Sequence, residues 1–265
     1  MWTGEKGDEV WNGLARYYRI AAANGDYKAN VRLQYLLNTG RINTDMPQTE
    51  VHNLNEELAK QLPATAYYNL YGYLDEGYGV RTEEGGKYAY LRKAADLGSR
   101  EAQYTVAEML ADIEDSEETQ EAFKYRLNLV KQLRSCASEQ GLGEVSSNLG
   151  ISLQMDKKYQ EALKVFHQGV KNGDSISALV LSHAFESGVQ ADNLNFLDVS
   201  PDDERVKRYH MISSYLSRYD YLQPKVPDLD DIVPLPPAKL PKWDGKIAFQ
   251  RWYEGEAPPK PSEAL

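Results

Sequence analysis

The chain has one cysteine, few phenylalanines, no long apolar run and no excess of basic residues. Cys136 stands alone, which excludes an intramolecular disulfide and a thiolate metal cluster. No apolar stretch approaches the roughly 20 residues that a membrane-crossing helix needs, so we expect no membrane span. The net charge of −10 argues against a nucleic-acid or anionic-membrane partner, because either would require clustered lysine and arginine.

The residues from Met1 to Asp8 also lack a basic segment followed by an apolar stretch, so we expect no signal peptide within this chain. The expected compartment is the periplasm if a signal peptide has been trimmed, and the alternative is the cytoplasm. The single cysteine does not separate the two, because helical proteins without disulfides are common in both.

No catalytic, cofactor-binding or metal-binding pattern occurs in the sequence. The histidines, which are His52, His167, His183 and His210, lie far apart and have no metal-ligand spacing. The acidic run Asp228–Asp231 lacks the glycine and the terminal glutamate of a calcium-binding loop. There is no glycine-rich phosphate loop and no nucleophile elbow. We therefore predict that the chain has no cofactor and is not an enzyme.

Tyrosine, by contrast, is abundant, with 19 tyrosines against 5 phenylalanines. A tyrosine side chain has a large apolar face and a polar tip, so it suits positions that are half-buried or that face a partner. We expect most of these tyrosines to pack between helices and some to form a binding surface.

Five similar junctions recur at intervals of 32 to 43 residues, which is the period of a helix–turn–helix solenoid. They are centred on Gly25, Leu62, Gly98, Gly141 and Gly173. Four residues after each junction comes a small residue, namely Ala29, Ala66, Ala102, Val145 or Ser177, and apolar residues follow at eight and twelve positions. Steps of four keep side chains on one helical face, so each first helix should present a small–large–large stripe to its neighbours.

These repeats predict an all-α helix–turn–helix solenoid over residues 1–222, built from ten to twelve antiparallel helices. Ser200–Glu204 reads as the start of a closing helix that runs to about Tyr221, since it combines a cap, a proline and acidic residues. Residues 223–265 are rich in proline but also contain aromatic residues that a disordered linker would not need. We expect this tail to pack on the solenoid, with Trp243 and Trp252 as anchors.

The repeat pattern resembles the Sel1-like repeat family, a relative of tetratricopeptide repeats. The residues that carry the resemblance are Ala66, Leu70, Tyr71, Gly72, Tyr73, Gly77, Tyr78, Gly79 and Val80, followed by Ala89, Lys93, Ala94, Ala95 and Gly98. The match covers about residues 10–190, is strong over 63–98 and is weak over 99–140. The family implies a right-handed superhelix that acts as an adaptor or binding scaffold, with repeat residues that are structural.

The tail resembles a narrower module of unknown function. The resemblance is carried by residues 235–245, 250–254 and 257–262. In Gram-negative bacteria that module follows Sel1-like repeats, often in proteins encoded beside type VI secretion effectors. The resemblance therefore implies an immunity protein, which binds a toxin and silences it.

We predict that the chain binds and neutralises a secreted antibacterial effector, and that this effector is a phospholipase (lipase) that acts in the periplasm. Its negative charge would suit an enzyme whose site binds anionic headgroups. Tyr35, Tyr68, Tyr71 and Asp75 lie between the stripe positions and are our candidates for partner contacts. The alternatives are a generic scaffold or adaptor and an enzyme whose site is unrecognised.

Overall fold

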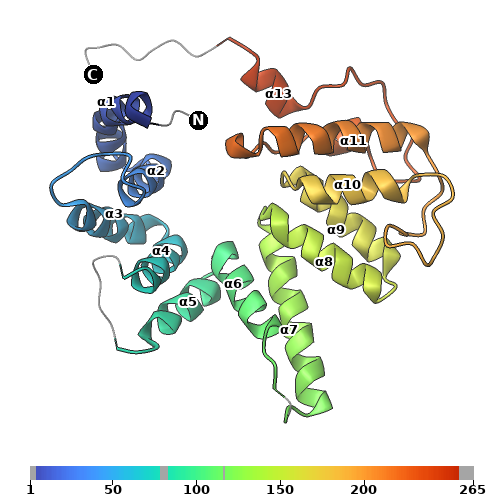
Figure 1. The fold of residues 1–265 in the computed structure, drawn as a ribbon, viewed down its shortest axis with the longest axis horizontal. Helices are drawn as coiled ribbons and strands as arrows, with labels where there is room; N and C mark the ends of the chain where they lie inside the picture. The colour runs from blue at the N-terminus through green and yellow to red at the C-terminus, as the bar shows by residue number, and fades with distance from the viewer. Residues whose placement is uncertain (1–3, 78–82, 116, 257–265) are drawn as a thin grey trace. The chain divides into compact units, whose positions relative to one another are not determined.

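The computed structural model describes residues 4–77, 83–115 and 117–256, and every regular element within those ranges is a helix (Figure 1). The all-α class predicted from the sequence is therefore confirmed. The chain forms two compact units, residues 1–133 and residues 134–265. Tyr78, Gly79 and Val80 of the expected repeat motif lie outside the described residues, as does the end of the tail, 257–265.

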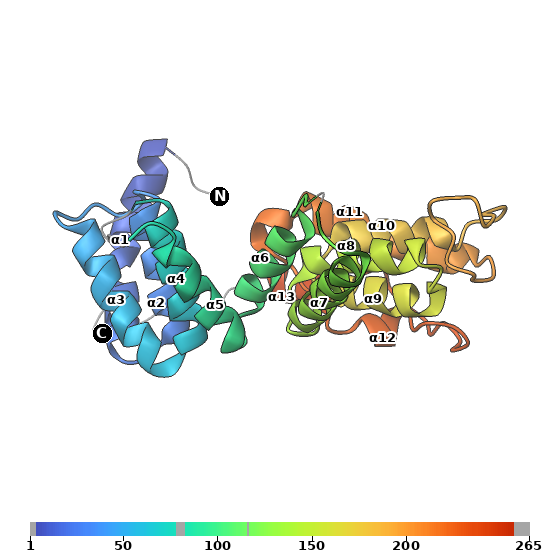
Figure 2. The ribbon, with the colours of Figure 1, turned by 90° about the horizontal axis from the view of Figure 1, so that it is seen from below.

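The first unit contains α1 (Gly4–Ala23), α2 (Tyr27–Asn38), α3 (Pro47–Gln61), α4 (Pro63–Asp75), α5 (Gly86–Asp96), α6 (Arg100–Ala111) and most of α7 (Gln120–Glu139). The second contains the end of α7, α8 (Gly143–Met155), α9 (Tyr159–Lys171), α10 (Ser175–Ala184), α11 (Asp203–Arg218), the short 3-10 helix η1 (Asp220–Leu222), α12 (Leu229–Ile232) and α13 (Ala248–Tyr253). Consecutive helices pack together from α1 to α6 and again from α8 to α11 (Figure 2). This chain-order packing of helix pairs is consistent with a Sel1-like solenoid.

All five predicted junctions are turns between consecutive helices. The four junction glycines have φ between 88° and 92°, a left-handed conformation that glycine adopts without steric cost. The residue after each of these glycines donates its N–H to a carbonyl five positions back, at 2.9–3.1 Å. At three of the junctions that same residue, Asp26, Ser99 or Asp174, also caps the next helix through its side chain. Two adjacent residues thus end one helix and start the next.

The predicted small residues of the stripe are all buried. The large positions that follow them are fully buried in α8 and α10 but only half-buried in α4 and α6. Close approach is tightest in the second unit. A Cβ atom added to Gly150 would lie 2.6 Å from the Phe166 ring, and one added to Gly169 would lie 2.3 Å from the Ser177 Oγ. Glycine is therefore required where α8, α9 and α10 meet.

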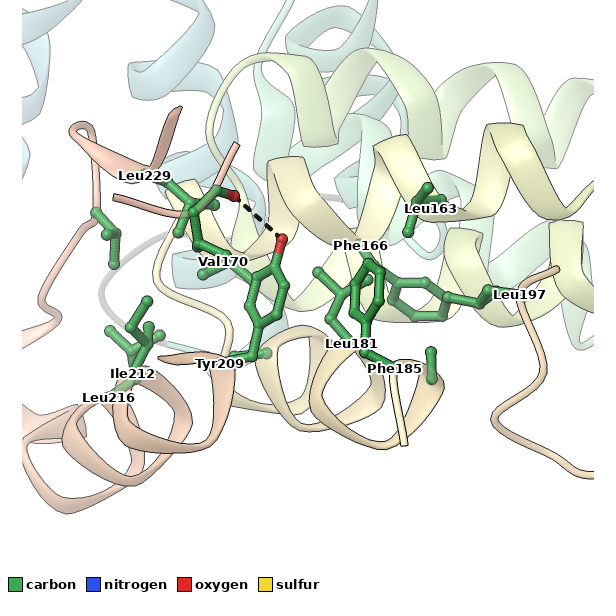
Figure 3. Close-up of a cluster of buried hydrophobic side chains, with 14 of the residues drawn as sticks. Leu163, Phe166, Val170, Leu181, Phe185, Leu197, Tyr209, Ile212, Leu216 and Leu229 are labelled. Carbon is green, nitrogen blue, oxygen red and sulfur yellow. Dashed lines mark hydrogen bonds between the residues drawn. The ribbon is translucent and has the colours of Figure 1, made fainter. Parts of the chain in front are cut away.

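The second unit is built around a core of aromatic and branched side chains (Figure 3). Phe166, Phe185 and Tyr209 are all fully buried, and the rings of Phe185 and Tyr209 stack with centroids 6.0 Å apart. These side chains come from α9, from the C-terminal cap of α10 and from α11, so the core joins three consecutive helices. Burying an aromatic side chain contributes about 2–3 kcal/mol, which makes this cluster the main source of stability in the unit.

The tail lies against this core. Its buried side chains are those of Val226, Leu229, Ile232, Val233 and Ile247. Trp243 is half-buried against the same cluster, but Trp252 is 72% exposed, so the anchoring role expected for Trp252 is wrong. Ile247 fills the core position instead. Ile247 precedes the first turn of α13, whereas Trp252 lies near the end of that helix with its side chain exposed.

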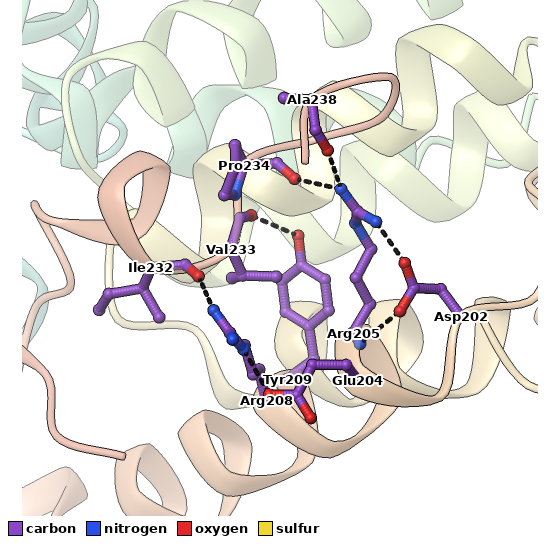
Figure 4. A network of polar contacts seen from close by, with 9 residues as sticks. All are labelled: Asp202, Glu204, Arg205, Arg208, Tyr209, Ile232, Val233, Pro234 and Ala238. Carbon is purple, nitrogen blue, oxygen red and sulfur yellow. Dashed lines mark hydrogen bonds and ion pairs between the residues drawn. The ribbon is translucent and has the colours of Figure 1, made fainter. Parts of the chain in front are cut away.

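Two buried arginines of α11 hold the tail by its backbone (Figure 4). Arg205 donates to the carbonyls of Pro234 and Ala238 at 3.0 and 2.6 Å, and Arg208 donates to those of Ile232 and Pro241 at 2.5 and 2.8 Å. Carbonyls in an extended, proline-rich segment have no helical partner and must be satisfied from outside. The arginines supply those donors, and their own charges are paired with acidic residues of the same helix turn. None of the described helices is both long and apolar enough to cross a membrane.

Candidate partner-binding surfaces

A cluster of tyrosines, Tyr67, Tyr68, Tyr71, Tyr88 and Tyr90, lies between α4 and α5 in the first unit; we call it the tyrosine patch. Ring centroids are 6.1 Å apart for Tyr68 and Tyr71, 6.5 Å for Tyr71 and Tyr88, and 6.2 Å for Tyr67 and Tyr90. The patch combines half-buried rings with the 44% exposed ring of Tyr88. Such rings contribute apolar contact area at small entropic cost, which is what a protein-binding surface requires.

Charged groups border the tyrosine patch. Asp75, at the end of α4, forms an ion pair with Lys87 of α5. Burial, followed by the negative charge of Asp75, raises the pKa of the Tyr71 hydroxyl above its usual value. The Tyr71 hydroxyl therefore stays protonated at neutral pH and can donate a hydrogen bond. The Tyr68 hydroxyl lies 3.4 Å from the Thr105 Oγ1 of α6, so this ring bridges two helices of the unit.

The structure brings Tyr68, Tyr71 and Asp75 together but leaves Tyr35 separate. Tyr35 lies on α2 with 43% of its surface exposed, and the guanidinium of Arg32 lies 5.1 Å from its ring centroid. Among the described residues, ring contacts join Tyr68 to Tyr71 and none joins Tyr35 to either. The four predicted contact residues therefore form one cluster and one isolated ring.

A buried amide network, which the sequence did not predict, fixes α2 against α3 and α4. The Tyr73 hydroxyl donates to the Gln34 Oε1 at 2.5 Å, and the Gln34 Nε2 donates to the Asn30 Oδ1 at 2.7 Å. Asn55 of α3 donates to the Ala66 carbonyl at 3.0 Å and accepts from Asn69 at 3.2 Å. The polar residues next to the stripe positions were the available signal in the sequence, but the bonds that join different helices link residues 11 to 39 positions apart.

A second polar cluster joins α9, α11 and α12 in the second unit. The His167 Nδ1 lies 3.0 Å from the Tyr209 hydroxyl, its Nε2 lies 2.8 Å from the Asp230 Oδ1, and Lys171 pairs with the other Asp230 oxygen at 2.5 Å. This order of groups resembles a proton relay, but Tyr209 is fully buried and burial raises its pKa. A relay needs an accessible acid or nucleophile. The arrangement instead positions the tail on α9.

No metal-binding arrangement was found in the described parts of the chain, where no group of three or more His, Cys, Asp or Glu side chains could hold an ion. The second unit does contain a pocket of about 380 Å³ between α11 and the tail, lined in part by Tyr215, Tyr219 and Trp243. Its signals in the sequence were the spacing of two tyrosines by four residues and the aromatic residues in a proline-rich tail. The closure of the pocket, however, depends on how that tail folds back.

Comparison with known proteins identifies the fold. Residues 177–265 match the profile of a domain of unknown function, DUF6396. No curated protein matches the sequence. Three solved structures from Pseudomonas aeruginosa are similar: PA5086 (22% identity, 86% of this chain and 81% of that one, TM-score 0.57), the immunity protein Pa5087 (22%, 86% and 81%, 0.59) and the immunity protein PA5088 (18%, 89% and 91%, 0.61).

The chain-order packing of helix pairs is consistent with a Sel1-like repeat fold, and residues 177–265 match the DUF6396 profile. Within that fold, the chain is structurally similar to the Pseudomonas immunity proteins Pa5087 and PA5088 at low sequence identity. The DUF6396 match begins within α10 and extends through α11 into the tail, which are the segments that the buried arginines and the core hold together.

Proposed function

We propose that this chain is an immunity protein, which binds a secreted antibacterial effector and neutralises it. The observation that carries the proposal is the similarity to Pa5087 and PA5088, both described as immunity proteins, over 86% and 89% of this chain. Because the aligned regions extend over most of both chains, the comparison covers more than a single shared repeat. The type VI secretion context and the identity of the effector are parts of the proposal.

The tyrosine patch supports a protein as the partner. Tyr68 and Tyr71 are pre-positioned by ring contacts with each other, and Tyr88 is substantially exposed beside them. Tyrosines of this kind are enriched among the residues that dominate the binding energy of protein interfaces. We therefore assign the effector contacts to Tyr68, Tyr71 and Asp75, with Tyr35 as a separate contact on α2.

We further propose that the effector is a phospholipase that acts in the periplasm. A phospholipase site must attract anionic phosphate headgroups, and a binding protein with a net charge of −10 complements such a site. Complementary charge raises the rate of association and disfavours partners of the wrong sign. On this proposal the immunity protein works in the compartment where the effector reaches its lipid.

The test uses the purified full chain and the type VI phospholipase effectors encoded in the same genome. Hydrolysis of vesicles made from phosphatidylethanolamine and phosphatidylglycerol is measured with and without the chain, and the stoichiometry is measured by calorimetry. We expect one effector to be inhibited through a one-to-one complex, and cells that express the chain to survive that effector. A chain that neither binds nor inhibits any of them contradicts the proposal, and several weak partners would instead indicate an adaptor.

A further inference from the structure

The pocket between α11 and the tail has a preformed wall. Ile212 and Ile247 are almost fully buried at its base. The Trp243 indole donates to the Lys246 carbonyl at 2.7 Å, which fixes the ring, and the guanidinium of Arg208 lies 5.7 Å from the centroid of that ring. The pocket is thus closed on one side by a tail segment that the buried arginines hold in place. Pre-positioned side chains lose little freedom on binding, which favours their use as a recognition site.

An aromatic rim, formed by Tyr219, Tyr221, Phe249, Trp252 and Tyr253, lies next to this pocket. Its rings contact one another, with centroids 5.5 Å apart for Phe249 and Trp252 and 6.5 Å apart for Tyr219 and Tyr253. Trp252 is 72% exposed, and Tyr221 and Tyr253 are each 48% exposed. Several large aromatic side chains exposed together, outside the core, mark a surface that binds another molecule.

The charge of the pocket wall is opposite to that of the protein as a whole. Its ionisable lining includes Arg218 and His210 and, among the described residues, no carboxylate. The nearby acids are already paired, Asp244 with Arg251 at 2.7 Å and Glu254 with Lys246 at 2.6 Å. Arg218 lies over the Tyr219 ring, 5.6 Å from its centroid, and no carboxylate of the described chain pairs with it.

The wall also contains a hydroxyl without a partner. The Tyr215 side chain lines the pocket, and its buried oxygen has no hydrogen-bond partner in the described part of the chain. Buried polar groups are normally satisfied, so a group of this kind next to a pocket indicates a missing acceptor or donor. Apolar rings, a cation and an unsatisfied hydroxyl together define the chemistry of an occupant.

We propose that the pocket and the aromatic rim bind a segment of a protein partner in which an aspartate or glutamate lies next to an aromatic or aliphatic side chain. The apolar side chain enters between Tyr219 and Trp243, and the carboxylate pairs with Arg218. This proposal rests on the proposed function in that the effector is the partner that supplies the segment. It adds a second contact surface, within the DUF6396 region, to the tyrosine patch.

The first test needs no effector. A library of random 12-residue peptides displayed on phage is selected on the full chain, on Arg218→Glu and on Arg92→Glu, a matched charge reversal on α5 whose side chain is 85% exposed. On the wild-type chain and on Arg92→Glu, we expect enrichment of peptides that carry Asp or Glu next to an aromatic or aliphatic residue. On Arg218→Glu the preference should change to Lys or Arg. Absence of acidic–aromatic enrichment, or the same enrichment on Arg218→Glu, overturns the proposal.

The second test locates the peptide and separates the two proposals. A selected peptide should shift the indole N–H resonances of Trp243 and Trp252, and Trp252→Ala, at an exposed position, should weaken it about tenfold, which corresponds to about 1.4 kcal/mol. If the peptide binds in this way but no effector is neutralised, the proposed peptide site is supported and the proposed function is contradicted. If Arg218→Glu and Trp252→Ala neutralise an effector as well as the wild-type chain does, the proposed function is supported and the proposed peptide site is contradicted.

Discussion

The imidazole of His167 on α9 bridges the Tyr209 hydroxyl on α11 and the Asp230 carboxylate on α12, at 3.0 and 2.8 Å. With a neutral ring, the Nε2–H donates to the carboxylate and the Nδ1 can accept from the hydroxyl, which also lies 3.5 Å from the Val233 carbonyl. Burial lowers the pKa of His167, and this outweighs the opposite effect of Asp230. The folded state therefore favours the neutral form more strongly than the unfolded chain does.

This bridge predicts that the protein loses stability in mild acid. The unfolded chain binds the His167 proton near the ordinary pKa of 6.5, whereas the folded chain binds it only at lower pH. The free energy of unfolding should therefore be highest above that value and fall as the pH drops below it, by at most about 1.4 kcal/mol per pH unit for one proton. Urea unfolding at pH 7.5, 6.5 and 5.5 measures this slope, and His167→Gln should reduce it. An equal slope in the variant would assign the acid sensitivity to other groups.

The buried arginines predict a second effect on stability. Arg208→Met removes the donors for the Ile232 and Pro241 carbonyls and leaves both without a partner. Since a buried unsatisfied carbonyl such as that of Ile232 costs about 1–3 kcal/mol, we expect a loss of about 1–3 kcal/mol in the free energy of unfolding and faster proteolysis of the tail. Arg92→Met, at an exposed position, is the control and should change the stability by less than about 0.5 kcal/mol. Equal melting curves for the two variants would contradict this role.

The tail itself offers a contrast between two apolar residues. Ile247 is 2% exposed within the core, and Trp252 is 72% exposed. Ile247→Ala should lower the free energy of unfolding by about 2–4 kcal/mol, because it leaves a cavity, whereas Trp252→Ala should change it by less than about 0.5 kcal/mol. Truncation after Leu222 removes all the buried tail residues and should lower the melting temperature further. Chemical denaturation of the three variants measures the free energy of unfolding of each and tests this order of stabilities.

The close helix contacts predict opposite effects for two glycine substitutions. Gly150→Ala would place a methyl group 2.6 Å from the Phe166 ring, and the resulting repacking should cost about 1–3 kcal/mol. Gly13→Ala, in α1, meets no atom within 4 Å and should stabilise the chain by up to about 1 kcal/mol, because alanine has the higher helix propensity. Thermal unfolding of both variants tests these two effects on stability. An unchanged stability of Gly150→Ala would mean that the core relaxes around the added methyl group.

The tyrosine patch gives the prediction for partner binding. The double variant Tyr68→Ala and Tyr71→Ala should weaken effector binding at least about tenfold and abolish protection, because residues of this kind dominate interface energies. Tyr125→Ala, on α7 with 73% of its surface exposed, is the control and should bind normally. Circular dichroism verifies that the variants are folded. Folded variants with normal protection would show that the effector binds elsewhere.

The sequence predicted the features that depend on neighbours along the chain. The five junctions follow from glycines and capping residues that lie side by side, and the small residues of the stripe are buried as the four-residue spacing indicates. The features that it missed join distant residues. The contact between Arg208 and the Pro241 carbonyl spans 33 positions, and no periodic pattern encodes it. The exposure of Trp252 likewise depends on which side of α13 faces the core.

Arg205 and Arg208 hold the tail through its backbone, so the groups that dock the tail differ from the side chains that the tail exposes. Both side chains donate to main-chain oxygens, which every amino acid possesses, so these hydrogen bonds do not themselves depend on which side chain stands at the four positions contacted. The side chains that project from the same tail, such as Trp252, are under no such structural demand. Selection can therefore alter the side chains that the docked tail exposes without disturbing these backbone contacts, and one scaffold can carry different surfaces.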